Sequence, residues 1–246
     1  VRKLCSELDD LGISPLHGLV QAGLCCHPAA LTLLLKAGAD PNVQSNPSGS
    51  EYTSGQWGKK SGGGKLEAIL SQPDRSPLHA ALDRDDPSEA IVKLLLEHRA
   101  DPNLRDNEGR TALHLALDFG DDRGGIELAL CDLLLQHGAD PSLGSKEIGM
   151  ENSCLHAAVF ANELPAVELL LRHGALHSAP GKNGWTPLAI AVRGANAGIV
   201  EALLGAGADP EAPTPSNLSV RELAVINKKP KVIEALSSAA RGLSIE

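Results

Sequence analysis

Ser76-Pro77-Leu78-His79 is a phrase that the chain repeats, with small changes, along most of its length. The other copies are Ser14-Pro15-Leu16-His17, Thr111-Ala112-Leu113-His114, Ser153-Cys154-Leu155-His156 and Thr186-Pro187-Leu188-Ala189. Each copy is followed by a leucine run that ends in Gly-Ala-Asp-Pro or a close variant, as in Leu133–Pro141 and Leu203–Pro210. A pair of phrases that recurs about every 33 residues predicts a repeat array, in which each unit buries its core only against its neighbours.

The residue types in both phrases are those that begin and end helices. Ser or Thr before a first helix can cap free amides, Pro suits an early helical position, and Gly after a second helix suits a left-handed cap. Leucine and alanine must fill the interfaces, because 42% of the residues are hydrophobic while only 2% are aromatic. Each unit is therefore predicted to hold two helices and a connecting hairpin.

The two phrases together resemble the ankyrin repeat, whose first helix opens on Thr-Pro-Leu-His and whose second helix ends in a leucine run before Gly-Ala-Asp. The match covers residues 12–238. The resemblance implies an all-α repeat solenoid of helix-turn-helix units joined by hairpin loops, with about five repeats and a degenerate C-terminal cap. It also implies that His17, His79, His114 and His156 are structural residues that bond backbone between repeats.

Counting between the phrases places the boundaries of the units. Regular units take 18 residues from the first-helix His position to the second-helix Gly, as from His156 to Gly174, whereas repeats one to three take more and carry enlarged turns. Lys228, Lys229 and Lys231 stand where a further repeat would need apolar residues, as in a cap with a polar outer face. The predicted segments are an N-terminal capping helix at 1–11, repeat one at 12–44, an insertion at 45–74, repeats two to five at 75–106, 107–147, 148–180 and 181–213, a capping repeat at 214–238 and a tail at 239–246.

A Gly- and Ser-rich insertion interrupts the hairpin that follows repeat one. From Asp40 to His79 the chain takes 39 residues, whereas the same step from Asp101 to His114 takes 13, so 26 residues are extra. Loops of this length are usually either functional or disordered. Tyr52 and Trp57 lie inside the insertion and favour a contact role, while a solvated loop with incidental aromatic residues is the alternative.

Charge, hydropathy and cysteine usage exclude several classes of function. A net charge of −9 argues against general nucleic-acid binding, which needs a basic surface. No window has the length and hydropathy of a transmembrane span, so direct membrane insertion is not expected. The scattered cysteines fit a reducing compartment better than a disulfide framework. They indicate an intracellular protein, cytoplasmic in the first instance, with the nucleus or an organelle left open.

The sequence offers no catalytic centre. The histidines of the tetrapeptides recur once per unit, and no pair of a nucleophile and a base can be assigned to them. Cys25, Cys26 and His27 are neighbouring ligand types, but no second cluster accompanies them. We therefore expect no enzyme activity, no cofactor and no metal.

The resemblance implies a binding surface instead. In ankyrin repeats the hairpin tips and the exposed ends of the first helices line a concave groove that receives a protein partner. The matching positions put three aromatic residues on one face of consecutive repeats, with arginines as polar anchors, and such residues are typical of interface hot spots. These residues are Phe119, Phe160 and Trp185, with Arg84, Arg110 and Arg193. The alternative is that Phe119 and Phe160 pack against the enlarged turns.

Acidic residues gather at the ends of the first helices of repeats two and three, among them Asp83 and Asp118. They favour a partner with a basic segment, although the same cluster is typical of a solvated turn. We expect a non-catalytic protein–protein interaction module, either an adaptor or a subunit of a larger assembly. The alternative is a regulatory or targeting domain of a longer chain whose catalytic or channel domain lies outside this sequence.

Overall fold

A computed structural model describes residues 13–21, 28–45, 74–83, 87–117, 127–145, 152–181 and 183–242. The chain divides into two compact units, Val1–Leu115 and Ala116–Glu246, and each is described by itself. The capping helix predicted at 1–11 lies outside the described residues.

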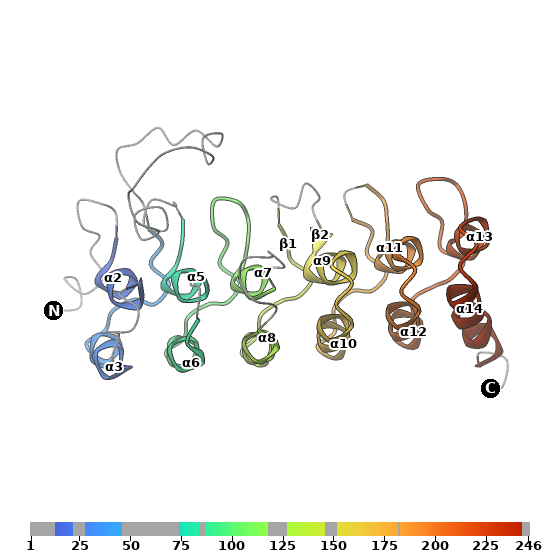
Figure 1. Ribbon diagram of the computed structural model, residues 1–246. Helices are drawn as coiled ribbons and strands as arrows, with labels where there is room; N and C mark the ends of the chain where they lie inside the picture. The colour runs from blue at the N-terminus through green and yellow to red at the C-terminus, as the bar shows by residue number, and fades with distance from the viewer. Residues whose placement is uncertain are drawn as a thin grey trace, which may run out of the picture. The chain divides into compact units, whose positions relative to one another are not determined.

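The first unit consists of paired helices. α2 (Pro15–Gln21) is followed by α3 (Pro28–Lys36), and α5 (Pro77–Leu82) by α6 (Glu89–Glu97) (Figure 1). α2 packs against α5 and α3 packs against α6, so first helices stack on first helices and second helices on second helices. α7 (Ala112–Ala116) begins repeat three.

The second unit repeats this arrangement through to the C-terminal cap. α9 packs against α11 and α11 against α13, while α8, α10, α12 and α14 form the second layer in that order. The prediction of an all-α array of helix-turn-helix units is confirmed. The bounds are α8 Leu128–Gln136, α9 Cys154–Phe160, α10 Leu164–Arg172, α11 Pro187–Gly194, α12 Ala197–Gly205, α13 Val220–Ile226 and α14 Pro230–Gly242.

Extended structure is minor in the described segments. β1 (Gly144–Ser145) and β2 (Asn152–Ser153) form one antiparallel pair, in the hairpin that leads into α9 (Figure 1). A single bridge joins Pro213 to Ser219 in the hairpin before α13. Both pairings join the two arms of a hairpin, so they leave the all-α class unchanged.

The helix ends follow the predicted capping chemistry. The Ser76 hydroxyl accepts a hydrogen bond from the His79 amide at 3.4 Å, and the Thr186 hydroxyl accepts one from the Ala189 amide at 3.3 Å. Gly38, with φ of 93°, ends α3 in the left-handed region that glycine adopts without strain. Arg99 occupies the same position after α6 with φ of 67°. Its Cβ makes this left-handed backbone conformation less favourable than it is for glycine.

The hydrophobic core lies between the stacked helices of successive repeats. The leucine of every tetrapeptide is buried, because it points from a first helix into the interface with its neighbours. A leucine of each second helix is equally buried in the parallel layer. These residues are Leu16, Leu78, Leu113, Leu155 and Leu188 in the first layer and Leu31, Leu95, Leu134, Leu170 and Leu203 in the second.

The hairpins share one tip geometry. In the hairpin before α7, the Gly109 amide donates to the Asp106 carbonyl at 2.9 Å and the Asp106 amide donates to the Arg110 carbonyl at 3.0 Å. Gly109 has φ of 76°, so the turn ends on a left-handed residue. The same pair of bonds recurs in later hairpins, at Gly181, Gly184 and Trp185 and again at Thr214, Asn217 and Leu218.

The hairpin that carries the insertion keeps this tip. The Asp74 amide donates to the Ser45 carbonyl at 2.8 Å, the Ser45 amide donates to the Arg75 carbonyl at 2.7 Å, and Asp74 has φ of 61°. Ser45 and Asp74 therefore belong to the hairpin itself, and residues 46–73 stand where two residues stand in the hairpins before α7, α11 and α13. A segment of 28 residues in place of two accounts for the 26 extra residues counted along the sequence.

Candidate functional site

The histidines of the first unit join successive repeats. His17 Nε2 donates to the Arg75 carbonyl oxygen at 2.8 Å, and His79 Nε2 donates to the Arg110 carbonyl oxygen at 3.2 Å. The opposite ring nitrogen, Nδ1, accepts from the amide of Ser14 at 3.4 Å or of Ser76 at 3.2 Å, which fixes the neutral tautomer with the proton on Nε2. The structural role implied for His17 and His79 is confirmed.

Burial keeps these imidazoles neutral. Desolvation lowers the pKa of His79 to about 4, against which the Asp106 carboxylate and the Arg110 carbonyl act weakly. Desolvation also lowers the pKa of His114 to about 4, with the Arg105 charge acting in the same direction. His17 and His79 are buried and bonded at both ring nitrogens, which is the arrangement of structural histidines, whereas His114 is bonded at Nδ1 and its buried Nε2 forms no hydrogen bond.

His156 in the second unit is bonded on one side alone. Its Nδ1 lies 2.9 Å from Ser153 Oγ, as in the other repeats. Its Nε2 forms no hydrogen bond of good geometry, but the Trp185 and Ala179 carbonyls lie close enough to interact with it and to raise the pKa that burial lowers. The side chain is 2% exposed and Nε2 itself is buried, so these carbonyls, and not a ligand in the hollow beside it, are the partners within its reach.

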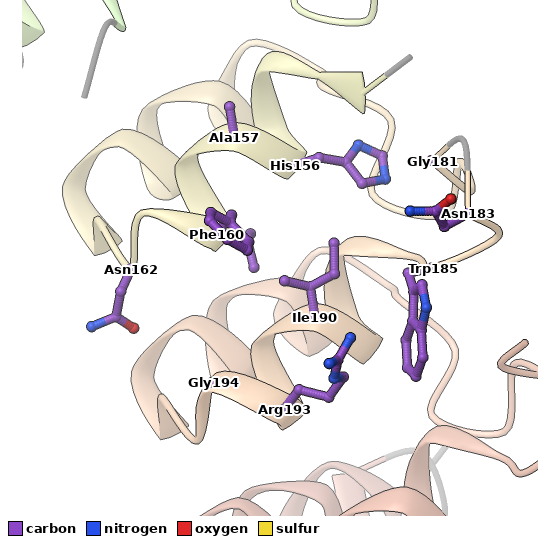
Figure 2. Close-up of a pocket in the computed structure, with 11 residues that line it drawn as sticks. His156, Ala157, Phe160, Asn162, Gly181, Asn183, Trp185, Ile190, Arg193 and Gly194 are labelled. Atoms are coloured by element: carbon purple, nitrogen blue, oxygen red, sulfur yellow. The ribbon is translucent and has the colours of Figure 1, made fainter. Parts of the chain in front are cut away.

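A hollow of about 740 Å³ opens between repeats four and five, beside His156. Phe160 at the end of α9 forms one side, and Trp185 and Arg193 form the other (Figure 2). Ile190 on α11 lies between these two sides, and Asn183 lies beyond His156 (Figure 2). The sequence prediction that Phe160, Trp185 and Arg193 share one face agrees with this arrangement.

Phe160 and Arg193 face solvent at this hollow. Phe160 is 72% exposed, so it does not pack against a neighbouring turn. The Arg193 guanidinium carbon lies over the Trp185 ring, 4.7 Å from its centre, which is a cation–π contact. Within the described part of the chain Arg193 has no carboxylate partner, so its N–H edge stays open to a ligand.

Other predicted site residues lie in a buried ion network of the first unit. Asp83, expected at the partner surface, is buried and forms an ion pair with Arg75. Asp106 is buried between two arginines, 2.9 Å from Arg110 Nε and 3.9 Å from Arg75 Nη2. Arg110 also lies 2.6 Å from Glu108, so its charge is neutralised within the hairpin. These contacts make Asp83 and Arg110 parts of the scaffold.

The remaining predicted contacts lie outside the described residues. They are Phe119, Arg84, Asp118, Tyr52 and Trp57. The cysteine and histidine cluster Cys25, Cys26 and His27 lies outside them too.

The structure adds residues that the sequence reading missed. His156 lines the hollow, whereas the sequence pattern indicates only a repeat histidine. Val225 and Ile226 at the end of α13 are exposed apolar residues. Counting could have found Ile226, because it follows Glu222 by the same four residues that separate Phe160 from His156 and Arg193 from Ala189.

Neither a metal site nor a membrane-spanning helix is found in the described segments. No group of His, Cys, Asp and Glu side chains there is arranged to hold a metal ion. None of the helices described has the length and hydropathy to cross a bilayer. Cys131 and Cys154 are free and buried.

Comparison with known proteins agrees with the helical repeats. The model of the family described as "Ankyrin repeats (3 copies)" matches residues 62–145 and 124–214. The crystal structure of the ankyrin repeat domain of Bcl-3, a member of the IkappaB protein family, is similar over 95% of this chain and 86% of that one, with a TM-score of 0.67 and 26% identity.

Two curated proteins resemble parts of the chain. Neurogenic locus notch homolog protein 1 of Danio rerio is 31% identical over an alignment of 159 residues, which covers 63% of this chain and 6% of that protein. Transient receptor potential channel pyrexia of Drosophila melanogaster is 33% identical over an alignment of 124 residues, which covers 41% of this chain and 13% of that protein. The matched segments are thus small parts of much longer proteins. The family match and the stacked helix pairs agree, and the chain belongs to the ankyrin repeat family.

Proposed function

We propose that this chain is a non-catalytic interaction module, an adaptor or a subunit of an assembly, that binds a protein partner at the hollow between Phe160, Trp185 and Arg193. The chain belongs to the ankyrin repeat family, and ankyrin repeats generally mediate protein–protein interactions. The fold does not say where on the array a partner sits. The exposed residues of repeats four and five support the location that we propose.

The observation that carries the proposal is the exposure of Phe160 beside the stacked Trp185–Arg193 pair. A phenylalanine side chain left 72% in water gains nothing for the fold of the isolated protein. Aromatic residues and arginine around a concavity are the composition of interface hot spots.

Capture of partners from cell extract tests the proposal. Wild-type protein and the variants Phe160→Ala and Trp185→Ala are immobilised, and retained proteins are identified by mass spectrometry. Leu176→Ala is the matched control, because Leu176 is also an exposed apolar residue, at 57%, but does not line the hollow. Partners retained by wild type and by Leu176→Ala, and lost from both hollow variants, are the expected result. Equal retention by all four proteins would refute the site, provided that circular dichroism shows them equally folded.

The chemistry of the partner has two alternatives. The sequence favours a basic segment, on the strength of acidic residues that include Asp83. Within the described residues Asp83 is already paired with Arg75, which weakens that support. The hollow in repeats four and five is lined by Arg193, which favours an acidic segment.

A second candidate function is a regulatory or targeting domain within a longer polypeptide. The curated relatives support it, since the matched segments are 6% and 13% of those proteins. An immunoblot of the endogenous protein with an antibody against this chain distinguishes the two candidates. A band well above 25.6 kDa supports the longer polypeptide, and a band near 25.6 kDa supports the separate module. In either form, buried free thiols at Cys131 and Cys154 fit our proposal of a reducing, intracellular location.

A further inference from the structure

We propose that the partner presents an extended, acidic segment to the second unit, with a carboxylate at Arg193 and an apolar residue on either side of it. This inference rests on the proposed function and specifies its ligand. It is carried by the charges of the hollow, by the exposed residues one repeat further on, and by the spacing of the repeats.

The described lining of the hollow has charge of one sign. Among the described residues that line it, Arg193 alone carries a full charge at neutral pH, because burial holds His156 neutral. No carboxylate belongs to this described lining. The cation–π contact with Trp185 places the guanidinium at the hollow, and its exposed N–H groups can donate to a carboxylate.

The apolar surface continues beyond Arg193 into the cap. Ile226 is 59% exposed and stands at the end of α13 as Arg193 stands near the end of α11 and Phe160 at the end of α9. These three helices pack against one another in that order. Phe160, Arg193 and Ile226 therefore form one row along consecutive repeats, apolar, cationic and apolar, which we call the αe row. Val225 widens its apolar end, and exposed Lys228 lies just past it in the sequence.

The spacing of the row selects the shape of the segment. Packed helices lie about 8–10 Å apart, so neighbouring members of the αe row are separated by roughly that distance. A polyproline II segment has three residues per turn and rises about 3.1 Å per residue, so positions i, i+3 and i+6 share a face at steps of about 9 Å. An apolar residue, an acidic residue and an apolar residue at these positions match Phe160, Arg193 and Ile226. Aromatic-lined grooves are known to receive such preformed segments.

A peptide assay tests this specificity. The probe is fluorescein-labelled Leu-Pro-Pro-Glu-Pro-Pro-Leu, which holds the three side chains at the required spacing, and binding is followed by fluorescence anisotropy. Two further peptides replace Glu by Lys or move Glu one position toward the C-terminus. We expect the Glu peptide to bind wild-type protein at least about tenfold more tightly than either, because the others place a cation at Arg193 or misalign the carboxylate.

Charge reversal on the protein provides the second half of the test. Arg193→Glu is expected to abolish the preference for Glu and to favour the Lys peptide. Arg172→Glu, which reverses an exposed arginine on the second-helix layer, is the matched control and is expected to keep the wild-type preference. Arg193→Gln, which keeps a polar side chain without the charge, covers the case in which Arg193→Glu fails to fold, and it is expected to bind both peptides alike.

The outcomes separate this inference from the proposed function. Equal binding of the Glu and Lys peptides, stronger binding of the Lys peptide, or no binding of any peptide to wild-type protein overturns the acidic-segment inference. If Phe160→Ala still loses its captured protein partners in that case, the proposed function stands without it. If capture is unaffected by Phe160→Ala, the proposed function itself fails.

Discussion

Ser45 and Arg75 hold each other across the base of the insertion: the Ser45 amide donates to the Arg75 carbonyl at 2.7 Å, and the Arg75 amide donates to Ser45 Oγ at 3.1 Å. The same Arg75 carbonyl accepts from His17 Nε2 at 2.8 Å. Chain segments on both sides of residues 46–73 are thereby tied to each other and to the first helix of repeat one. These contacts between repeat one and repeat two are made by residues outside 46–73.

Removing the insertion is therefore expected to preserve the fold. Residues 46–73 are replaced by Asn-Glu, the pair that stands at the tip of the next hairpin as Asn107 and Glu108. Closing a shorter loop on folding costs less conformational entropy, so the free energy of unfolding should rise by about 1–2 kcal/mol. Urea denaturation followed by circular dichroism measures it. A marked loss of helix or of stability would show that the insertion contributes contacts to the repeats.

The carboxylate of Asp106 is expected to be essential for the first unit. It accepts from the Glu108 and Arg110 amides at 3.0 and 2.8 Å and neutralises two arginines. Asp106→Ala removes the carboxylate that the two arginines share, leaving Arg75 with Asp83 and Arg110 with Glu108, and it takes the acceptor from two hairpin amides. The free energy of unfolding should fall by about 3 kcal/mol. Glu211→Gln, which breaks an exposed pair with Arg221, is the control and should leave the urea midpoint nearly unchanged. A similar small effect for both variants would contradict the buried network.

Acid is expected to destabilise the protein through its buried histidines. Their pKa falls from 6.5 in the unfolded chain to about 4 in the folded one for His79 and His114. Between these values the unfolded chain binds more protons, so stability decreases as pH falls through that window, by at most about 1.4 kcal/mol per pH unit for each histidine. Above pH 6.5 both histidines are neutral in either state and their effect ends.

His114→Gln should flatten this pH dependence, because glutamine does not titrate. Urea midpoints at several values between pH 7 and pH 4.5 measure the slope, and His137→Gln, at an exposed histidine, is the control. Identical slopes for wild type and His114→Gln would show that His114 is not the buried, neutral group described above.

The thiols of Cys131 and Cys154 are expected to be unreactive in the folded protein. Burial raises the pKa of Cys131 to about 12 and raises that of Cys154 further, so neither forms the thiolate that alkylation requires. Iodoacetamide treatment at pH 8, followed by peptide mass mapping, should leave both unmodified in buffer and modify both in urea. Rapid labelling of either one without denaturant would indicate that its repeat opens readily.

Much of the architecture is predictable because the two phrases of each repeat encode local and interfacial chemistry together. The capping residues Ser76 and Thr186 and the buried leucines Leu78 and Leu188 all lie where the pattern places them. The count of 26 extra residues also agrees with the hairpin between repeats one and two. The residues at which the insertion joins this hairpin, Ser45 and Asp74, were less predictable, because hydrogen bonds of the turn, and not residue types, define them.

The sequence by itself determined the repeat family, the helix pairs, the core leucines and the size of the insertion, because each depends on a period that the chain repeats. Tertiary structure decided which of the equivalent hairpin residues are available. Arg75, Arg110 and Trp185 occupy equivalent positions in three of the hairpins. Arg75 is nevertheless buried beside Asp83 and Asp106, Arg110 is paired with Asp106, and Trp185 remains at an open hollow beside Arg193. The physical reason is that exposure and charge pairing depend on the residues that neighbouring repeats bring close, and no single phrase of the sequence contains them.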